Sequence, residues 1–398
     1  MTSLGQHIAD LSAELQQCRT ESTNDSPKMM ACEEALQDAL DEMRATVTPP
    51  ARWWQSMIMT PADSAAIQVA FKAKVFEHIP QNSPIDIRQL SNLAQVPENN
   101  LVRVLRLLVL NRILAEPKPG HFAHTPLSLA AKTSQASKGA GFLYSMFSRA
   151  GAGLAEAINS PREGYTAWEA AFGTPVYQFF ENNPTEREQF GTALATLAAP
   201  EMEDLAAIFP WGSLGKLVDV GGGAGHVATT LARQYPELRI INQDLPGVIE
   251  DCKQAVAKLP LDDFESEVFS RIDFEPHNFY DLQPESDADG YLLRQCLHNN
   301  SDTDCVKVLK ALVPGLLTPG ARLLINETVL GEETAGSNQK AKRLHQKDLM
   351  AMTIGAKERT RAEFLSLLKA ADERYEIDRI YIGKGDLALL SAKLTVPP

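Results

Sequence analysis

Apolar residues recur at helical spacing along the N-terminal part of the chain. They lie three or four positions apart in two runs, first Leu4, Ile8, Leu11 and Leu15, and then Leu36, Leu40 and Met43. A polar stretch at residues 20–28 separates the runs, and Pro49 and Pro50 follow them. The pattern predicts two amphipathic helices that pack in a core or in a dimer.

The next region, residues 64–128, has the pattern of a small winged helix-turn-helix unit. Three apolar helices are expected at residues 67–76, 87–94 and 101–110, and a Gly/Pro hairpin follows at 117–120. A third helix that reads DNA would expose basic and polar groups. This one is rich in leucine and offers only Arg103, Arg106 and Arg112, so packing or dimerisation is favoured over DNA binding.

After Trp211 the pattern changes to short apolar runs that alternate with helices. Strands are expected at 216–220, 238–242, 290–294, 321–327, 375–382 and 387–390, with helices at 227–234, 304–317 and 360–371. The alternation predicts an α/β fold, a Rossmann-like domain with a mostly parallel sheet, preceded by an all-helical winged-helix dimerisation domain. The expected parts are a helical extension (1–48), the winged-helix domain (49–135), a helical connecting and substrate segment (136–210) and the Rossmann-like domain (211–398).

The composition of the chain disfavours several classes of binding partner. A chain of 398 residues is longer than a single hydrophobic core supports, so more than one domain is expected. Its 51 acidic and 38 basic residues give a net charge of −13, which disfavours nucleic acid as a partner. The five cysteines are scattered without a CxxC pair, so neither a disulfide framework nor a metal site is expected. The chain shows neither a signal peptide nor an apolar run of membrane length. We therefore expect a reduced cytoplasmic protein without a membrane partner.

A glycine-rich loop follows the first expected strand of the Rossmann-like domain. The stretch Asp-Val-Gly-Gly-Gly-Ala-Gly begins at Asp219 and has glycines at alternate positions, namely Gly221, Gly223 and Gly225. Such glycines let the backbone approach a ligand closely, and Asp219 suits a ligand with a cationic amino group. Asp244 ends the second strand, where a carboxylate can accept both hydroxyls of a ribose. Together these residues favour S-adenosylmethionine (SAM) over NAD as the cofactor.

The loop, together with Gln-Asp-Leu-Pro at residues 243–246, resembles the O-methyltransferase family of the caffeate/flavonoid type, in particular its fungal secondary-metabolite branch. The similarity extends from about Ala65 to Leu390. It includes Phe-Ala-His-Thr-Pro-Leu-Ser at 122–128, Thr-Ala-Trp at 166–168 and Asn-Pro at 183–184. The resemblance implies SAM-dependent methylation of a phenolic or enolic hydroxyl by a homodimer. In that dimer the N-terminal region of one subunit borders the pocket of the other.

The resemblance also assigns residues to roles. It implies His298 as the general base, with Glu327 and Glu358 as carboxylates that orient it. For the cofactor it implies Asn278, Phe279 and Arg294 beside the glycine loop. For a flat aromatic or polyketide-like substrate it places Phe180, Leu194, Leu349, Met350, Thr353 and His124 near the pocket. That pocket is expected between residues 177–197 and the C-terminal sheet.

Two positions depart from the family pattern. Asn300 stands where many members have a tryptophan, and Asn278 replaces an aspartate in the segment His-Asn-Phe-Tyr at 277–280. Relatives of this family include pericyclases and dehydratases that bind SAM without transferring its methyl group, and this alternative stays open, with His124, His298 or Arg294 polarising a carbonyl. A winged-helix regulator that uses SAM only structurally is disfavoured by the acidic charge and the leucine-rich third helix.

Overall fold

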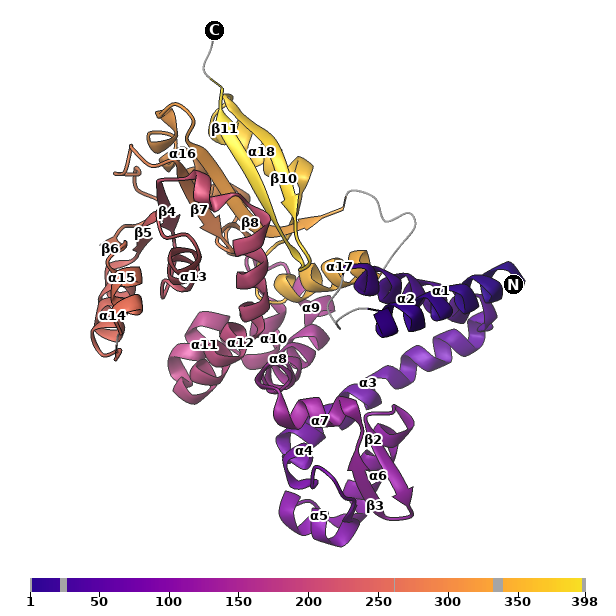
Figure 1. Ribbon diagram of the computed structural model, residues 1–398. Helices are drawn as coiled ribbons and strands as arrows, with labels where there is room; N and C mark the ends of the chain where they lie inside the picture. The colour runs from indigo at the N-terminus through magenta and orange to yellow at the C-terminus, as the bar shows by residue number, and fades with distance from the viewer. Residues whose placement is uncertain (1, 22–26, 261, 332–338, 396–398) are drawn as a thin grey trace. The chain divides into compact units, whose positions relative to one another are not determined.

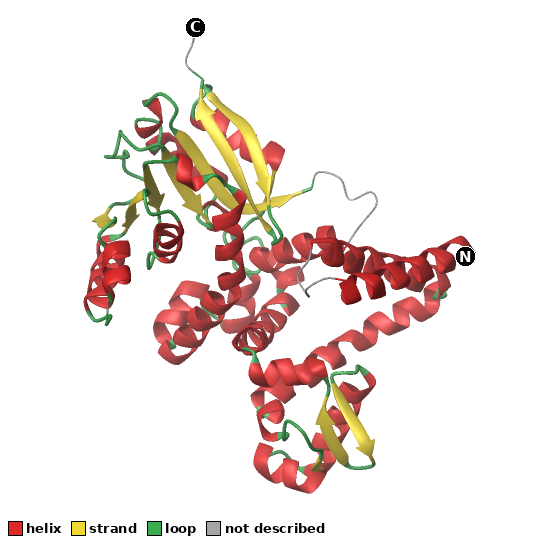
Figure 2. Cartoon of the chain, viewed as in Figure 1, coloured by secondary structure: helices red, strands yellow, loops and turns green. Residues whose placement is uncertain are grey.

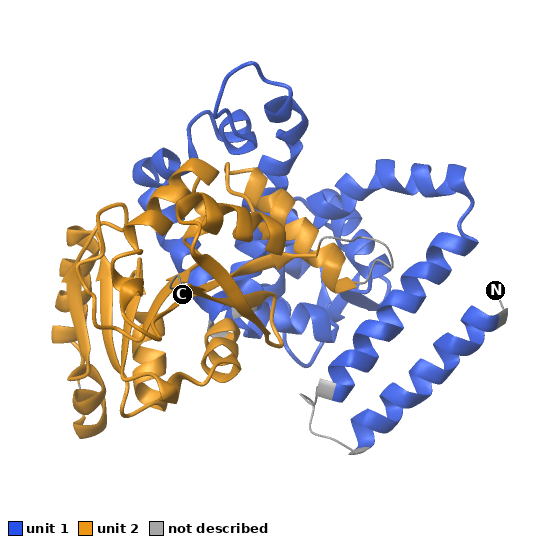
Figure 3. Cartoon of the chain, turned by 90° about the horizontal axis from the view of Figure 1, so that it is seen from above, with its two compact units in different colours: residues 1–198 blue, residues 199–398 orange. Residues whose placement is uncertain are grey.

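The computed structural model describes residues 2–21, 27–260, 262–331 and 339–395. The chain divides into two compact units, Met1–Ala198 and Ala199–Pro398 (Figure 3). The finer division into four parts stays a prediction. The polar break expected at residues 20–28 lies mostly outside the described residues.

The first unit is mainly helical (Figures 1 and 2). Its helices are α1 (Thr2–Glu21), α2 (Pro27–Val47), α3 (Pro50–Lys72), α4 (Val75–His78), α5 (Ile87–Ala94), α6 (Glu98–Leu110), α7 (Pro126–Thr133), α8 (Gln135–Ala152), α9 (Leu154–Ile158), α10 (Ala167–Phe172), α11 (Val176–Asn182) and most of α12 (Pro184–Ile208). Three short strands, β1 (Ile85–Asp86), β2 (Leu114–Lys118) and β3 (His121–His124), form a small antiparallel sheet in the order β1-β3-β2.

The winged-helix region has its own core. Leucines of α5 and α6, among them Leu90, Leu101 and Leu105, are fully buried against Phe76 and Phe122. The hairpin predicted at residues 117–120 is the turn between β2 and β3, so this mainly helical region also contains a three-stranded sheet. The predicted N-terminal pair of helices is confirmed, with α1 and α2 packed through a small buried cluster.

The second unit contains the larger sheet. Its elements are β4 (Lys216–Val220), α13 (His226–Gln234), β5 (Arg239–Asp244), α14 (Pro246–Ala257), α15 (Asp263–Phe269), β6 (Ile272–Pro276), β7 (Gly290–Arg294), α16 (Asp302–Ala311), β8 (Arg322–Leu330), α17 (Gln339–Met352), β9 (Arg359–Thr360), α18 (Arg361–Ala371), β10 (Tyr375–Ile382) and β11 (Leu387–Leu394), with 3₁₀ turns η1 (Trp211–Ser213), η2 (Leu297–Asn299) and η3 (Gly315–Leu317).

The strand order is β10-β11-β8-β7-β4-β5-β6, and β9 pairs with β8. Strands β4 to β9 pair in parallel, whereas β11 is antiparallel both to β8 and to β10. Alternate residues of β8 enter two separate cores, since Leu323 and Ile325 pack on one face and Leu324 on the other. This confirms the predicted mostly parallel Rossmann-like sheet with apolar layers on both faces.

Several expected boundaries are wrong. The last strand, β11, runs to Leu394 rather than ending at residue 390, and the helix expected at 67–76 is interrupted between α3 and α4. Glu327 does not end its strand, because β8 continues to Leu330. Thr328 pairs with β11, and Val329 and Leu330 pair with β9. The helix expected at 304–317 ends at Ala311, and the 3₁₀ turn η3 follows Pro314. Among the described residues, no helix is long and apolar enough to cross a membrane.

Candidate functional site

The candidate site lies in the second unit, at the carboxyl edge of the parallel strands. Strands β4, β5, β7 and β8 are neighbours and run in the same direction, so the loops that follow them gather at one edge. Ligands of open α/β sheets bind at this edge. The glycine loop follows β4, Asp244 ends β5, and His298 lies in η2, just after β7.

The glycine loop is held to the sheet by its own backbone. The N–H groups of Gly221 and Gly222 both donate to the carbonyl of Gln243, at 2.8 and 3.0 Å. A Cβ at Gly222 would lie 2.2 Å from Asn242 Oδ1 and 2.6 Å from Asp219 Oδ2, so no side chain fits there. At Gly223 the backbone has φ +55°, and a Cβ would meet no heavy atom of the described chain within 4 Å. The loop is therefore packed tightly beneath Gly222 and open beside Gly223.

Gly225 differs from Gly223, because the protein itself occupies the space beside it. It is the N-cap residue of α13 with φ +76°, and its N–H donates to the Gly222 carbonyl at 3.1 Å. A Cβ at Gly225 would lie 3.1 Å from Phe274 Cε1, on β6. The left-handed backbone and the Phe274 ring thus account for glycine at this position without a ligand. The assignment of Gly225 to the cofactor stays a prediction.

Asp219 is a buried carboxylate beneath this loop. It is 1% exposed, and neither of its oxygens accepts a hydrogen bond from any described residue. Burial raises the pKa of Asp219 to about 7, against the opposing effect of the Arg294 charge. A cationic group brought close to Asp219 would favour its ionised form. The residue therefore fits the neighbourhood of a cationic ligand group.

Asp244 is oriented by the same loop. Its Oδ2 accepts from the Gly223 N–H at 2.8 Å, and its Oδ1 accepts from the Leu245 N–H at 2.7 Å. An ionised carboxylate has about four acceptor positions, so free ones remain for two hydroxyl groups. Asp244 is also half-buried at the edge of the sheet. This geometry suits the ribose role expected for it.

The segment after β6 adds an aromatic wall beside the loop. The ring of Phe279 would lie 3.5 Å from a Cβ at Gly221, and it packs edge-to-face with Tyr280 at 4.8 Å between ring centres. Asn278 is exposed, and its Oδ1 accepts from the Tyr280 N–H at 3.1 Å. Phe279 and the glycine loop are thus neighbours, while Asn278 faces solvent, and the assignment of both residues to the cofactor stays a prediction.

Arg294 at the end of β7 is engaged in a buried ion pair. Its Nη2 donates to Glu201 Oε2 at 3.1 Å, and its Nη1 donates to Gln295 Oε1 at 3.1 Å. Burial raises the pKa of Glu201, which the positive charges of Lys347 and Arg294 partly offset. Arg294 supplies positive charge near Asp219. Its assignment to the cofactor stays a prediction.

His298, Glu327 and Glu358 form one cluster. His298 Nδ1 lies 3.4 Å from Glu358 Oε1 and 3.8 Å from Glu327 Oε2. Both glutamates are buried, whereas the His298 side chain keeps 19% of its surface exposed. The structure therefore brings together the three residues that the sequence pointed to, with two carboxylates on one ring nitrogen.

The electrostatics of this cluster favour a charged imidazole. Burial alone would lower the pKa of His298, but the hydrogen bond with Glu358 and the charges of Glu327 and Glu358 outweigh it and raise that pKa. Burial likewise raises the pKa of Glu327, although the nearby His298 and two backbone N–H groups counteract it. A proton on Nδ1 is thus stabilised by the carboxylates around it.

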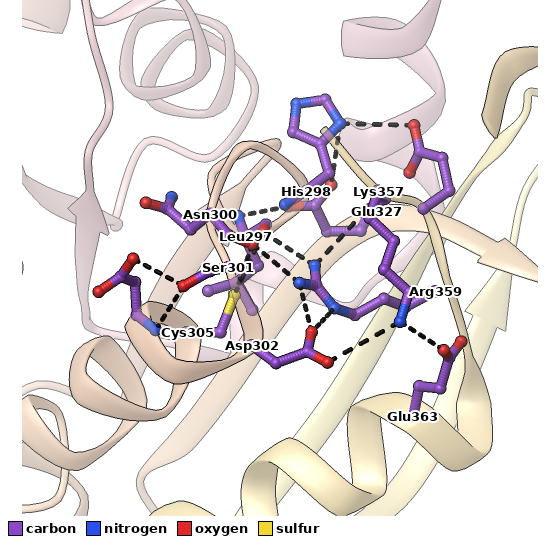
Figure 4. Close-up of polar contacts among 12 residues, drawn as sticks. Leu297, His298, Asn300, Ser301, Asp302, Cys305, Glu327, Lys357, Arg359 and Glu363 are labelled. Atoms are coloured by element: carbon purple, nitrogen blue, oxygen red, sulfur yellow. Dashed lines mark hydrogen bonds and ion pairs between the residues drawn. The ribbon is translucent and has the colours of Figure 1, made fainter. Parts of the chain in front are cut away.

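Several residues that hold this cluster in place were missed in the sequence. Glu327 Oε1 accepts from the Leu297 N–H at 2.8 Å, and Asp348 accepts from the Glu358 N–H at 3.0 Å. The buried Arg359 donates to the carbonyls of Leu297 and Asn300, at 2.9 and 2.8 Å. It also binds Asp302 through two nitrogens (Figure 4). In the sequence, the only indication of this role is the position of Arg359 next to Glu358.

The predicted substrate residues are distributed over both units. In the first unit, Phe180 is buried among aromatic rings, 4.5 Å from the Phe190 ring centre, and Leu194 is exposed. In the second unit, Leu349 and Met350 are exposed on α17, while Thr353 is buried and donates to the Met350 carbonyl at 2.6 Å. Their assignment to one pocket stays a prediction.

His124 is already engaged within the winged-helix region. Its Nδ1 lies 3.0 Å from Ser128 Oγ, and its Nε2 lies 3.2 Å from the Ile79 carbonyl. Burial lowers the pKa of His124. These contacts give the residue a structural explanation, and a role toward substrate has no support from its surroundings.

Comparisons with known proteins agree with this geometry. A family profile for an O-methyltransferase domain matches residues 152–372, and one for an O-methyltransferase dimerisation domain matches residues 57–132. The chain is 35% identical to O-methyltransferase sol2 of Alternaria solani, over 94% of this chain and 87% of that one. It is 30% identical to 6-hydroxytryprostatin B O-methyltransferase of Aspergillus fumigatus, over 82% and 96% of the two chains.

Solved structures show the same fold. OxaC, solved with S-adenosylhomocysteine (SAH) and oxaline, superposes with a TM-score of 0.76 at 20% identity, covering 98% of this chain and all of that chain. The mitomycin 7-O-methyltransferase MmcR gives a TM-score of 0.73 at 23% identity, over 89% of this chain and all of its own. At this level of identity the likeness concerns the fold.

Proposed function

Since the chain belongs to the SAM-dependent O-methyltransferase family and contains its dimerisation domain, we propose that it methylates a phenolic or enolic hydroxyl of a small secondary metabolite, with His298 as the general base. The observation that carries this proposal is the pair of buried carboxylates on His298 Nδ1. A phenol has a pKa near 10, so its oxygen must lose a proton as it attacks the methyl carbon.

The contacts of His298 Nδ1 determine which role the other ring nitrogen, Nε2, can take. A proton on Nδ1 is shared with Glu358 at 3.4 Å, and the charge of Glu327 stabilises it. In the neutral ring this leaves Nε2 with a free lone pair, which can accept the proton of the substrate hydroxyl. The resulting imidazolium is stabilised by the same two carboxylates. Glu327 and Glu358 are therefore positioning residues that act through His298.

The residues of the glycine loop fit SAM as the cofactor. Gly223 leaves open space, Asp244 keeps free acceptor positions for ribose hydroxyls, and Asp219 offers a buried carboxylate without a hydrogen-bond donor among the described residues. SAM, when bound, supplies an electrophilic methyl group on a sulfonium leaving group. Transfer then requires only alignment of the acceptor oxygen with that methyl group, desolvation and a base.

The direct test uses SAM labelled in its methyl group. Wild-type protein is incubated with labelled SAM and a panel of phenolic and enolic acceptors, and products are read by mass. We expect an acceptor to gain the label, and His298→Ala to lower the rate by about 10²–10⁴-fold. Binding of SAH to His298→Ala, measured by calorimetry, should match the wild type, since His298 lies outside the glycine loop.

Two outcomes would contradict parts of this proposal. Label transfer by His298→Ala at the wild-type rate would rule out His298 as the base. A product that forms without label while SAM is not consumed would instead support the pericyclase or dehydratase alternative. No contact among the described residues favours that alternative over methyl transfer, so methylation remains the proposed function.

A further inference from the structure

Asn300, one of the two positions that depart from the family pattern, forms a hydrogen bond with Tyr280. Asn300 stands where many members have a tryptophan, and Tyr280 carries a hydroxyl at the last position of the segment 277–280. The Tyr280 hydroxyl donates to Asn300 Oδ1 at 2.7 Å. Asn300 Nδ2 in turn donates to the Cys296 carbonyl at 2.7 Å. Both the oxygen and the nitrogen of the Asn300 side-chain amide are therefore hydrogen-bonded.

This contact joins two loops of the second unit that come from different strands. Tyr280 follows β6, at the outer end of the sheet, and Asn300 follows β7, on the other side of β4. The segment after β6 thus passes the carboxyl end of β4, which is consistent with the Phe279 ring lying against Gly221. The Tyr280–Asn300 hydrogen bond connects the aromatic wall to the segment that carries His298.

Each end of the bridge is fixed by further contacts. On the β7 side, Arg359 Nη2 donates to the Asn300 carbonyl at 2.8 Å, and Cys305 Sγ lies 3.5 Å from the same oxygen (Figure 4). On the β6 side, Asn278 holds the Tyr280 N–H, and Phe279 packs against the Tyr280 ring. Tyr280 is 41% exposed, so packing alone does not fix its side chain. The hydrogen bond from the Tyr280 hydroxyl to Asn300 supplies the further constraint on the position of this side chain.

We propose that the Tyr280–Asn300 hydrogen bond is a positioning device for the cofactor, which holds Phe279 and Tyr280 as a wall over the glycine loop. The proposal rests on SAM binding at this loop. Tyr280 and Asn300 act through the aromatic wall, so they set the affinity for SAM and SAH rather than the rate of proton removal.

The test is a double-mutant cycle on Tyr280→Phe and Asn300→Ala. A neutral hydrogen bond contributes about 0.5–1.5 kcal/mol, which corresponds to roughly a 2- to 13-fold change in Kd. We expect each single variant to weaken SAH binding in calorimetry within that range, and the double variant to bind no more weakly than Asn300→Ala alone. The KM for SAM should rise by the same factor, while kcat at saturating SAM changes less than twofold.

Asn299→Ala is the matched control, because Asn299 is an exposed neighbour in the same 3₁₀ turn. It should leave the Kd for SAH unchanged. An unchanged Kd in Tyr280→Phe, or full additivity in the double variant, would overturn the bridge while leaving the proposed function standing. A wild-type protein that fails to bind SAH would overturn both. A fall in kcat with unchanged KM would show that the bridge does not act on the cofactor.

Discussion

At the scale of single residues, the chemistry of the site depends on buried carboxylates with few donors. Glu327 Oε2 and Glu358 Oε2 are buried without a hydrogen bond to any residue that the structure describes. Such groups are costly unless a cation stands nearby. The imidazolium of His298 is that cation, so the carboxylates stabilise the state that forms during proton removal. The same argument applies to Asp219, where a cationic group of the ligand would add to the positive charge of Arg294.

This arrangement predicts how activity depends on pH. Only neutral His298 accepts a proton, so kcat/KM should fall as the pH decreases through the raised pKa of His298. In Glu358→Gln the hydrogen-bonded carboxylate that raises this pKa is gone, and the acid limb should move to lower pH. The plateau rate should also decrease, because the ring loses its orientation. A pH profile of kcat/KM measures both effects.

An acid limb that stays in place in Glu358→Gln would show that another group titrates there. Glu363→Gln is a suitable control, because the contacts of the Glu363 carboxylate are with Thr360, at the start of α18, and with Lys357, rather than with the His298 ring. Its pH profile should match that of the wild type.

At the scale of elements, the strands with uniform apolar runs were predictable, and those shaped by tertiary pairing were not. Residues 216–220 form β4 as expected, because Leu217, Val218 and Val220 are buried on both faces of a central strand. Strand β6 was missed, since Asp273 and Glu275 interrupt its apolar pattern at the sheet edge. The extension of β8 past Glu327 depends on pairing with β11 and β9, which come later in the sequence.

In the glycine loop, too, some features were predictable from the sequence and others depended on tertiary contacts. Its position between β4 and α13 and its alternating glycines were evident from the sequence. The sequence did not show that Gly222 has no room for a side chain, because Asn242 lies on another strand, nor that Gly225 faces the Phe274 ring of β6. Arg359 escaped prediction for the same reason, since its partners Asp302, Leu297 and Asn300 follow β7.

Two glycine substitutions in the loop separate ligand contact from backbone packing. Gly222→Ala should lower the melting temperature clearly, since overpacking costs about 1–3 kcal/mol. Gly223→Ala places a methyl group in open space at φ +55°, so it should cost only the left-handed strain of about 1–2 kcal/mol while weakening SAH binding at least tenfold. Calorimetry with SAH and thermal unfolding measure the two effects.

Gly320→Ala is the control for backbone strain. Gly320 has φ +89°, and its Cβ would also meet no described atom within 4 Å, but it lies in the turn before β8, at the amino end of that strand and away from the carboxyl edge that carries the site. It should lower stability by a similar amount and leave SAH binding unchanged. Wild-type affinity in Gly223→Ala would remove the loop from the cofactor site.

At the scale of the whole molecule, the first unit has an apolar surface without a partner among the described residues. Trp53, Trp54, Met57, Ile58 and Met59 lie on the N-terminal half of α3, with exposed fractions between 37% and 72%. Exposed clusters of this kind mark interaction sites. Because the dimerisation-domain match begins at residue 57, within this helix, we propose that the occupant of this surface is α3 and its surroundings in a second copy of the chain.

The dimer proposal predicts a loss of assembly when charge enters this surface. Wild-type protein at micromolar concentration should have the mass of a dimer by light scattering, and the double variant Trp54→Glu/Ile58→Glu should be a monomer, because desolvating two carboxylates opposes association. Ile382→Glu is the control, since Ile382 is equally exposed (72%) but lies on β10 in the second unit.

The monomeric variant should still bind SAH, because every residue assigned to the cofactor lies in the second unit. If the N-terminal region of one subunit borders the pocket of the other, the same variant should also lose methyl transfer to its acceptor. A variant that remains dimeric would exclude α3 as the interface, and a monomer with full transferase activity would show that each subunit completes its own pocket.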